Sequence, residues 1–231
     1  MKKSVFSLGI IGIIIGLFFI GCDNGSTNNN NAPTLVCFGN SLTAGYGATT
    51  AGIDDKANSY PAYLQNRVSI PVINAGISGN TTLQALVRIN NDVLSKNPLI
   101  VIVELGANDV FRRVLLDSTR DNLQKIIALL DDGNRKIYIA KFYTEVVARE
   151  MLHTVEIDDY AYQTAIINRY DDMFNALAES NNVELIDDIW KGVWGIHMSD
   201  AVHPNKSGYE IMANNYYDAI KPYLEANNLL K

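Results

Sequence analysis

The stretch TLVCFGNSL, residues 34–42, decides how this chain folds. Its first five residues form a short apolar run, which is typical of a strand buried on both faces of a parallel sheet. Gly39 then lets the backbone turn sharply out of the strand, and Ser41 follows two residues later. In open α/β sheets, sites form at the carboxyl ends of the strands, so this turn places a serine hydroxyl where a site is expected.

The same alternation of apolar runs and helical patterns continues to the C-terminus. Apolar runs predict strands at residues 34–38, 72–74, 99–103, 136–140 and 183–186. Helical patterns cover residues 61–68, 82–95, 121–130, 159–180 and 206–226, and Pro222 is expected to kink the last helix or end it early. Strands that alternate with helices over short connections imply right-handed crossovers. We therefore expect the α/β class, as a three-layer α/β/α sandwich with a five-stranded parallel sheet.

The first 32 residues are expected to lie outside this domain. Two lysines precede an apolar run at residues 5–20, which ends at Gly21-Cys22. This arrangement is typical of a secretion signal, and its end resembles a bacterial lipoprotein cleavage site. We predict a signal peptide at residues 1–21, a lipidated Cys22 that anchors the protein to a membrane of the bacterial cell envelope, a flexible tether at 22–32 and one domain at 33–231. A single N-terminal membrane anchor is the alternative reading of the same run.

Charge and cysteine content exclude several classes of protein. The chain has 19 Lys and Arg against 25 Asp and Glu, a formal net charge of −6. This balance argues against nucleic acid or anionic lipid as an electrostatic partner. There are two cysteines, one of them the expected lipidation site, which excludes a disulfide scaffold and a cysteine-rich zinc site. Cys37 falls in the first apolar run, where we expect a small core residue.

A carboxylate and an imidazole stand close together near the C-terminus, in DAVHPN at residues 200–205. Asp200 and His203 are three residues apart, so on one turn their side chains share a face. The carboxylate can then accept the Nδ1 proton of the imidazole, which leaves Nε2 to take the proton of Ser41. The alternatives are an aspartate that caps a helix beside a hydrogen-bonded histidine, and a serine that only caps a helix. Pro204 weakens the first alternative, because it limits helical continuation just after His203.

Two further turns follow predicted strands and offer hydrogen-bond donors. NAGISGNTT, residues 74–82, leads into a helix, and a glycine there can bring a backbone N–H close to a ligand. ELGAND, residues 104–109, offers the side-chain amide of Asn108. Acyl transfer needs such donors at the developing oxyanion, although each segment alone is also an ordinary turn. The pattern Gly-x-Ser-x-Gly is absent around Ser41, since Thr43 occupies its last position, and this disfavours an ordinary α/β-hydrolase.

Together, the four segments resemble those of the SGNH hydrolases, also called the GDSL lipase/esterase family, and within it the bacterial thioesterase, arylesterase and lysophospholipase branch. The resemblance runs from about residue 34 to the last helix. It implies a flavodoxin-like fold that works without a metal or an organic cofactor. It also implies that Ser41 is the nucleophile and that Asp200 and His203 complete a triad. The backbone N–H groups of Ser41 and Gly79 and the amide of Asn108 would form the oxyanion hole.

The chain departs from this family in three places. Asn40 stands where an aspartate usually precedes the nucleophile, and Asn80 stands where a carboxylate is common. Because Asn40 is nearly isosteric with aspartate, we expect altered local electrostatics and an intact triad. Residues 143–157 form a longer, apolar connection, either a strand extension or short helix packed on the core or a flap over the acyl pocket. His153 and His197 match no family role; we expect the first in the extra connection and the second at the surface or beside the site.

These features predict a serine esterase that acts through an acyl-enzyme. Short acyl esters, acyl thioesters and lysophospholipids are the expected small-molecule substrates. Carbohydrate O-deacetylation, with the same chemistry in a more polar pocket, is a second reading. A noncatalytic binding lipoprotein on the same fold is a third, and labelling by a fluorophosphonate probe separates it from the two enzymes.

Overall fold

The computed structural model describes residues 32–231. The predicted signal peptide at residues 1–21, the predicted lipidation site Cys22 and almost all of the tether at 22–32 lie outside the described residues. Within residues 32–231, no helix has the length and apolar character that a membrane crossing requires.

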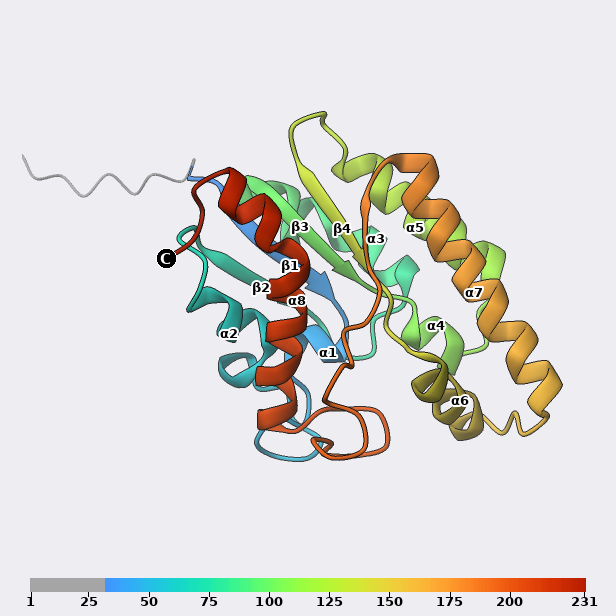
Figure 1. Ribbon diagram of the computed structural model, residues 1–231. Coiled ribbons are helices and arrows are strands. Elements are labelled where there is room, and N and C mark those ends of the chain that lie inside the picture. Colours follow the sequence, from blue (N-terminus) through green and yellow to red (C-terminus); the bar gives the residue numbers. More distant parts are fainter. Residues whose placement is uncertain (1–31) are drawn as a thin grey trace, which may run out of the picture. The chain divides into compact units, whose positions relative to one another are not determined.

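Five parallel strands form one sheet in the spatial order β2-β1-β3-β4-β5, which confirms the predicted architecture (Figure 1). The strands are β1 Thr34–Gly39, β2 Val72–Gly76, β3 Pro98–Glu104, β4 Lys136–Ala140 and β5 Glu184–Ile186. Each lies where an apolar run predicted it. In the register of the sheet, Gly39 at the end of β1 lies between Gly76 of β2 and Glu104 of β3. The carboxyl ends of three strands therefore meet beside Ser41.

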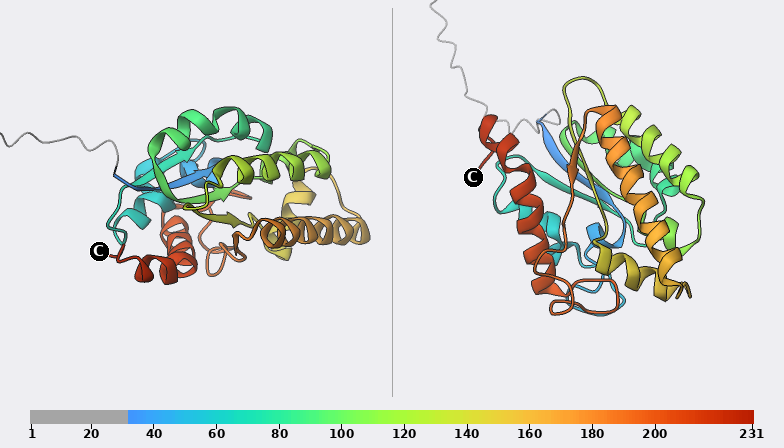
Figure 2. Two further views of the ribbon diagram at one scale, coloured as in Figure 1. Left: turned by 90° about the horizontal axis from the view of Figure 1, so that it is seen from above. Right: turned by 45° about the vertical axis from the view of Figure 1, so that its right-hand side comes forward.

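Helices cover both faces of this sheet. They are α1 Ser41–Ala44, α2 Tyr60–Gln65, α3 Thr82–Asp92, α4 Ala107–Phe111, α5 Leu116–Leu130, α6 Glu145–Thr154, α7 Tyr160–Asn181 and α8 Lys206–Ala226, with short 3-10 helices at Lys56–Asn58 and Leu94–Lys96. α2 and α8 pack together on one face, α3 and α5 pack on the other, and α7 lies beside α5 (Figure 1 and Figure 2). The expected three-layer sandwich is observed.

The helix boundaries differ from the prediction in a few places. α5 begins at Leu116 rather than at residue 121, and α2 ends at Gln65 rather than at residue 68. α3 ends at Asp92, and the chain continues as a 3-10 helix instead of the predicted helix to residue 95. α8 passes through Pro222 and reaches Ala226, so the proline does not end this helix early.

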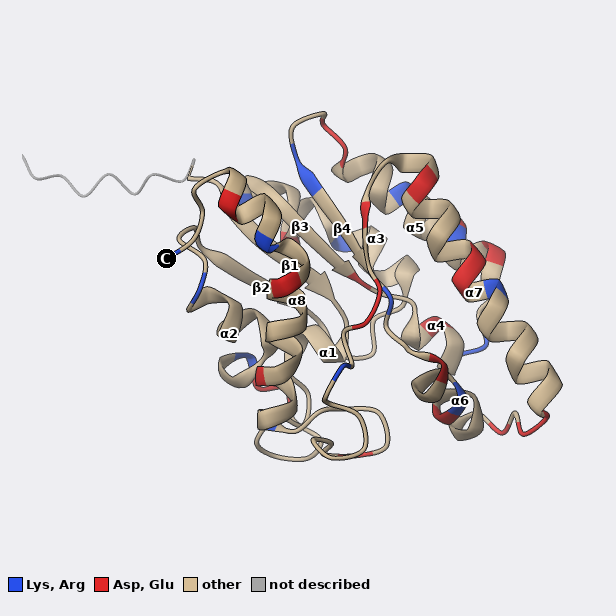
Figure 3. Cartoon of the chain, in the orientation of Figure 1, with Lys and Arg blue, Asp and Glu red and all other residues tan. Residues whose placement is uncertain are grey.

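The centre of the sheet is almost free of charge. The five strands contain three charged residues, Glu104, Lys136 and Glu184. Figure 3 shows most of the sheet in tan, the colour of uncharged residues. Lys136 and Glu184 form an ion pair of 2.8 Å on neighbouring strands, with exposed side-chain surface. Glu104 is different, because it ends the central strand β3 and is fully buried.

Cys37 in β1 is fully buried and lies in the hydrophobic core, which confirms its predicted role. Burial raises the pKa of its thiol far above the usual value, although a hydrogen bond involving Tyr60 opposes this shift. The thiol therefore stays protonated and unreactive at physiological pH.

Candidate active site

Ser41 is the first residue of α1, directly after β1. Asn40 caps this short helix, because its side-chain oxygen accepts a hydrogen bond from the backbone amide of Leu42 at 3.0 Å. A Cβ atom on Gly39 would clash with the Thr43 side chain and come within 2.8 Å of the Glu104 carbonyl oxygen. Glycine is thus required here for the close approach of α1 to the sheet, which holds Ser41 at its carboxyl edge.

The structure brings Ser41, His203 and Asp200 into direct contact. The Nε2 atom of His203 lies 3.0 Å from Ser41 Oγ. Its Nδ1 atom lies 2.8 Å and 3.0 Å from the two carboxylate oxygens of Asp200. The contact with Ser41 joins parts of the chain that are 162 residues apart. Nucleophile, base and orienting carboxylate are within hydrogen-bond distance in the order that acyl transfer requires.

Asp200 also caps the turn that carries His203. One of its oxygens accepts hydrogen bonds from the backbone amides of Val202 and His203, at 2.9 and 2.8 Å. Asp200 thus caps a turn and not a helix, since the N-cap of α8 is Asn205, and this role coexists with the contact to the imidazole. α8 begins only at Lys206, so His203 lies in the turn before it.

The charge state of Asp200 sets the proton position on the imidazole. Partial burial by itself would raise the pKa of Asp200, but hydrogen bonds from the Val202 amide and from His203, with the charge of the imidazole, hold that pKa below the usual value. The ionised carboxylate accepts, so the neutral imidazole carries its proton on Nδ1. Nε2 is then the acceptor for the hydroxyl proton of Ser41.

Tyr46 packs against the imidazole from the side of α1. Its ring centroid lies 4.5 Å from that of His203, and its backbone carbonyl accepts a hydrogen bond of 2.9 Å from the Tyr209 hydroxyl. Tyr209 is buried in α8. No pattern in the sequence indicates this contact, because Tyr46 lies far from both His203 and Tyr209 in the chain.

Gly79 and Asn108 lie on the same edge of the sheet, in the connections after β2 and β3. Gly79 has a φ of 78°, a conformation that favours glycine. Asn108 lies in α4, and its side-chain amide donates one hydrogen bond of 3.1 Å to the Asn80 carbonyl. No hydrogen bond joins either residue to Ser41 within the described part. The structure therefore assembles the three triad candidates directly and leaves the two oxyanion donors as a hypothesis.

Buried and half-buried polar side chains fix these two connections. The carboxylate of Asp109 accepts hydrogen bonds from the backbone amide and the hydroxyl of Thr82, at 2.9 and 2.6 Å, and so ties α4 to the start of α3. Arg88 donates to the side-chain oxygen of Asn80 at 2.7 Å and to the Gly39 carbonyl at 2.9 Å. Asn80 thus accepts from a guanidinium although it lacks the carboxylate common in the family. We did not predict Arg88 or Asp109 as site residues.

Asn40 is joined to the buried carboxylate of Glu104. Its amide nitrogen donates to Glu104 Oε1 at 3.0 Å, and the Thr43 hydroxyl donates to Oε2 at 3.1 Å. Burial raises the pKa of Glu104 to about 8, against the lowering effect of these hydrogen bonds. An aspartate at position 40 would put a second carboxylate against the first. The amide avoids this conflict and still caps α1.

Replacing Asn40 with aspartate is expected to make the protein less stable as pH rises above about 8. The new carboxyl group would lie within hydrogen-bond distance of the Glu104 carboxyl group, and two groups so close cannot both ionise easily. The folded protein therefore retains one proton that the unfolded chain releases. The free energy of unfolding then falls with pH, by roughly 1.4 kcal/mol per pH unit for one proton. In the native protein, the free energy of unfolding stops falling once Glu104 is ionised, near its pKa of about 8. Urea unfolding at pH values on both sides of 8 measures the difference.

The variant that carries both Asn40→Asp and Glu104→Gln reverses the pair and is the matched control. It holds one carboxyl beside one amide, so the additional pH dependence should disappear. Tyr60, Tyr209 and Tyr216 also face Glu104, but burial raises their pKa values well above the usual range, and they stay neutral. If the free energy of unfolding depends on pH above 8 in the same way in Asn40→Asp and in the native protein, this interpretation of the two carboxyl groups is wrong.

The remaining histidines lie outside the triad, as expected. His153 is exposed in α6, with Nδ1 2.6 Å from Asp158 Oδ1. His197 is half-buried, and its Nδ1 lies 2.8 Å from the Ser207 hydroxyl near the start of α8. In the described part of the chain, no group of three or more His, Cys, Asp or Glu residues has the arrangement of a metal site.

The long connection at residues 143–157 contains the helix α6. Val147, Ala148, Met151 and Leu152 are buried on one side of it, whereas Val146 is 58% exposed. The expectation of a short helix packed on the core is confirmed. The same helix also reaches the site, because Met151 lines a small cavity together with Ser41 and His203.

Comparison with known proteins agrees with this geometry. Residues 37–211 match the GDSL-like Lipase/Acylhydrolase family. The chain is 24% identical over 206 residues to Esterase TesA of Pseudomonas aeruginosa, covering 86% of this chain and 92% of that protein. It is 27% identical over 195 residues to Thioesterase 1/protease 1/lysophospholipase L1 of Escherichia coli, covering 79% and 81%.

A solved structure supports the fold. The psychrotrophic esterase EstA of Pseudoalteromonas sp., inhibited by monoethylphosphonate, superposes with a TM-score of 0.66 at 24% identity, over 83% of this chain and 98% of that one. The family match spans most of the chain and includes the segments of Ser41 and His203. The protein belongs to the GDSL-like lipase/acylhydrolase family.

Proposed function

We propose that this protein is a serine esterase that hydrolyses carboxylic esters or thioesters through an acyl-enzyme. The observation that carries the proposal is the continuous hydrogen-bond path from Ser41 Oγ through the imidazole of His203 to the carboxylate of Asp200. This path supplies a nucleophile, a general base and a group that stabilises the imidazolium.

The reaction proceeds in two steps. Ser41 Oγ attacks the acyl carbonyl carbon while its proton passes to His203 Nε2, and the imidazolium then gives this proton to the departing alcohol or thiol. A water molecule next attacks the acyl-enzyme, with the same imidazole as base, and releases the acid and the free serine. We assign the oxyanion to the backbone N–H groups of Ser41 and Gly79 and to the Asn108 amide, since Gly79 and Asn108 lie in the connections that follow β2 and β3.

A fluorophosphonate probe tests this proposal directly. Such a reagent phosphonylates an activated serine, so the native protein should gain one adduct, located on Ser41 by peptide mass spectrometry. A panel of acyl esters, acyl thioesters and lysophospholipids then identifies the leaving group. A folded protein that takes up no probe and hydrolyses no member of the panel would be a binding protein instead.

Carbohydrate O-deacetylation is the second candidate function. It uses the same residues, and the cavity beside Ser41, about 20 Å³ in volume, favours an acyl group as small as acetyl. Release of acetate from an acetylated oligosaccharide, faster than from a simple acetate ester, would establish this activity.

We also propose that Cys22 carries a lipid that holds the protein at a membrane of the bacterial cell envelope. The proposal is supported by the two lysines, the apolar run and the Gly21-Cys22 junction of the sequence. Cys22→Ala is expected to move the protein from the membrane fraction to the soluble fraction, or to leave an unprocessed precursor. Metabolic labelling with a fatty acid should tag the native protein and leave this variant untagged. A native protein without the tag would remove the proposed anchor.

A further inference from the structure

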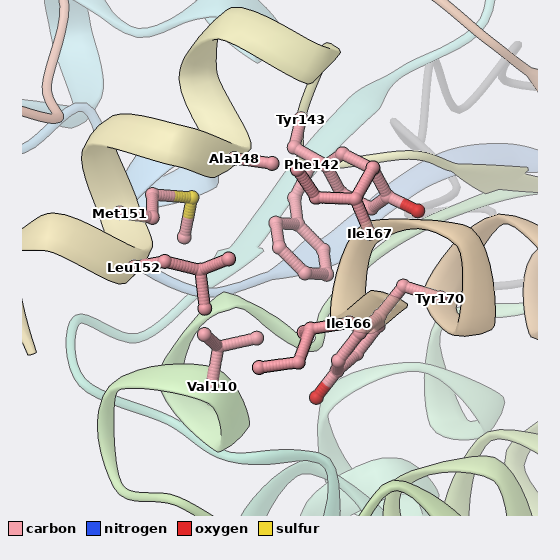
Figure 4. Close-up of a pocket in the computed structure, with 9 residues that line it drawn as sticks. All are labelled: Val110, Phe142, Tyr143, Ala148, Met151, Leu152, Ile166, Ile167 and Tyr170. Atoms are coloured by element: carbon pink, nitrogen blue, oxygen red, sulfur yellow. The ribbon is translucent and has the colours of Figure 1, made fainter. Parts of the chain in front are cut away.

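Three cavities follow one another from Ser41 into the region between α4, α6 and α7. The first, about 20 Å³, lies beside Ser41. The second is also about 20 Å³, and Figure 4 shows Met151 and Leu152 of α6 pointing into it opposite Ile166 and Tyr170 of α7. The third is about 380 Å³ and lies farther from the site, along the segment after α4 and along α7.

Two side chains separate the first cavity from the second. Phe142 and Met151 line both, and no other residue is common to the two. The second and third cavities share four lining residues, Val110, Leu152, Ile166 and Tyr170. The space beside Ser41 therefore ends at the Phe142–Met151 wall, behind which apolar space continues.

Phe142 is the fixed half of this wall. A Cβ atom on Gly106 would come within 2.7 Å of its ring, so the ring lies directly on that glycine. Its ring also packs edge-on against Tyr170 and Phe174, at centroid distances of 6.1 and 5.9 Å. The Trp190 indole donates a hydrogen bond of 2.9 Å to its backbone carbonyl.

Met151 is the adjustable half. It is 3% exposed on the buried side of α6, and its unbranched side chain has several rotatable bonds. Phe142 is held by an aromatic cluster, whereas Met151 depends on its own rotamer to fill the gap. Truncation of Met151 is therefore the simplest way to connect the first cavity with the second.

The size of the first cavity limits the acyl group. A volume of about 20 Å³ leaves room for a group of only a few atoms, since a single water molecule already needs about 10–15 Å³. A methyl group is of similar size, whereas the tail of a longer acyl chain needs space beyond the wall. We infer that the Phe142–Met151 wall ends the acyl pocket and restricts the enzyme to acetyl and similarly short acyl groups. This inference rests on the esterase function proposed above.

The test is an acyl-length profile of the full protein with p-nitrophenyl esters from acetate to decanoate. The native enzyme should have its highest kcat/KM for the shortest esters. Met151→Ala should raise the octanoate-to-acetate ratio of kcat/KM by roughly tenfold or more, because each accommodated methylene contributes about that factor in an apolar pocket. The double variant Met151→Ala/Leu152→Ala should extend the preference further, since Leu152 is one of the four side chains that line both the second and the third cavity.

Two single variants are the controls. Leu152→Ala removes a comparable buried side chain from α6 but leaves the wall in place, so it should not change the ratio. Val146→Ala changes the exposed side of the same helix and should behave as the native enzyme. Thermal unfolding of all variants separates a change of pocket from a loss of fold.

The outcomes distinguish this inference from the proposed function. A native enzyme that prefers octanoate or longer esters overturns the inference without any variant, even if Met151→Ala fails to fold. A folded Met151→Ala protein with an unchanged ratio overturns it as well. Failure of the esterase proposal has a different signature, namely that no ester is hydrolysed and Ser41 takes up no fluorophosphonate.

Discussion

Ser41→Ala is expected to lower ester hydrolysis by roughly 10⁴–10⁶-fold, the range typical for loss of a triad nucleophile. The alanine removes the oxygen to which Nε2 of His203 is hydrogen-bonded, Ser41 Oγ at 3.0 Å. Without this oxygen no acyl-enzyme forms, so both kcat and fluorophosphonate uptake should be lost. The activity is measured with a p-nitrophenyl ester at saturating concentration, against the rate of the uncatalysed reaction.

The fold should survive this substitution. The Ser41 side chain has one hydrogen bond of good length, to an imidazole that is itself held by Asp200, and its hydroxyl adds little to core packing. Ser180→Ala is a suitable control, because its exposed hydroxyl is hydrogen-bonded within α7 alone, to the Ala176 carbonyl and the Asn181 side-chain amide. If folded Ser41→Ala protein hydrolyses esters at the native rate, the nucleophile lies elsewhere and the triad assignment is wrong.

Much of the sheet was predictable from the sequence, because central parallel strands are short apolar runs that do not show the spacing of apolar residues typical of a helix. The triad candidates were predictable for a related reason, since their polar side chains follow such runs or lie in a distinct Asp-x-x-His turn. α1 and α4 were not predicted, as four or five residues are too few to show a helical period. α6 had a usable signal in the spacing of its buried residues, which is that of a helix rather than of a strand.

The contacts that support the site were much harder to predict. Glu104 was visible as the first residue of the segment ELGAND, but its partners come from residues 61 and 64 positions earlier in the chain. A buried carboxylate becomes meaningful only when Asn40 and Thr43 are known to face it. The same holds for Arg88, which reaches Gly39 across 49 residues. Such pairings depend on the register of β1 against β2 and β3, which the pattern of apolar residues does not specify.

Asn108→Ala is expected to lower kcat by roughly 10²–10³-fold, the usual loss when one oxyanion donor is removed. The Asn108 amide nitrogen carries two hydrogens, and its bond to the Asn80 carbonyl uses one of them. The other is the donor that we assign to the oxyanion. Because this hydrogen bond strengthens as negative charge develops, KM should change far less than kcat.

A purely structural role of Asn108 predicts a different result. Loss of its bond to Asn80 would loosen the connection that holds Gly79, and the melting temperature and KM would then change together with kcat. Asn108→Asp is the second variant. Neither alanine nor an ionised aspartate can donate to the Asn80 carbonyl, so both variants lose this bond, but only the aspartate brings negative charge to the developing oxyanion. An oxyanion role predicts that Asn108→Asp is less active than Asn108→Ala, whereas a structural role predicts activities that follow the two melting temperatures. If instead either variant changes only KM, Asn108 binds the substrate in its ground state and the oxyanion hole lacks this donor.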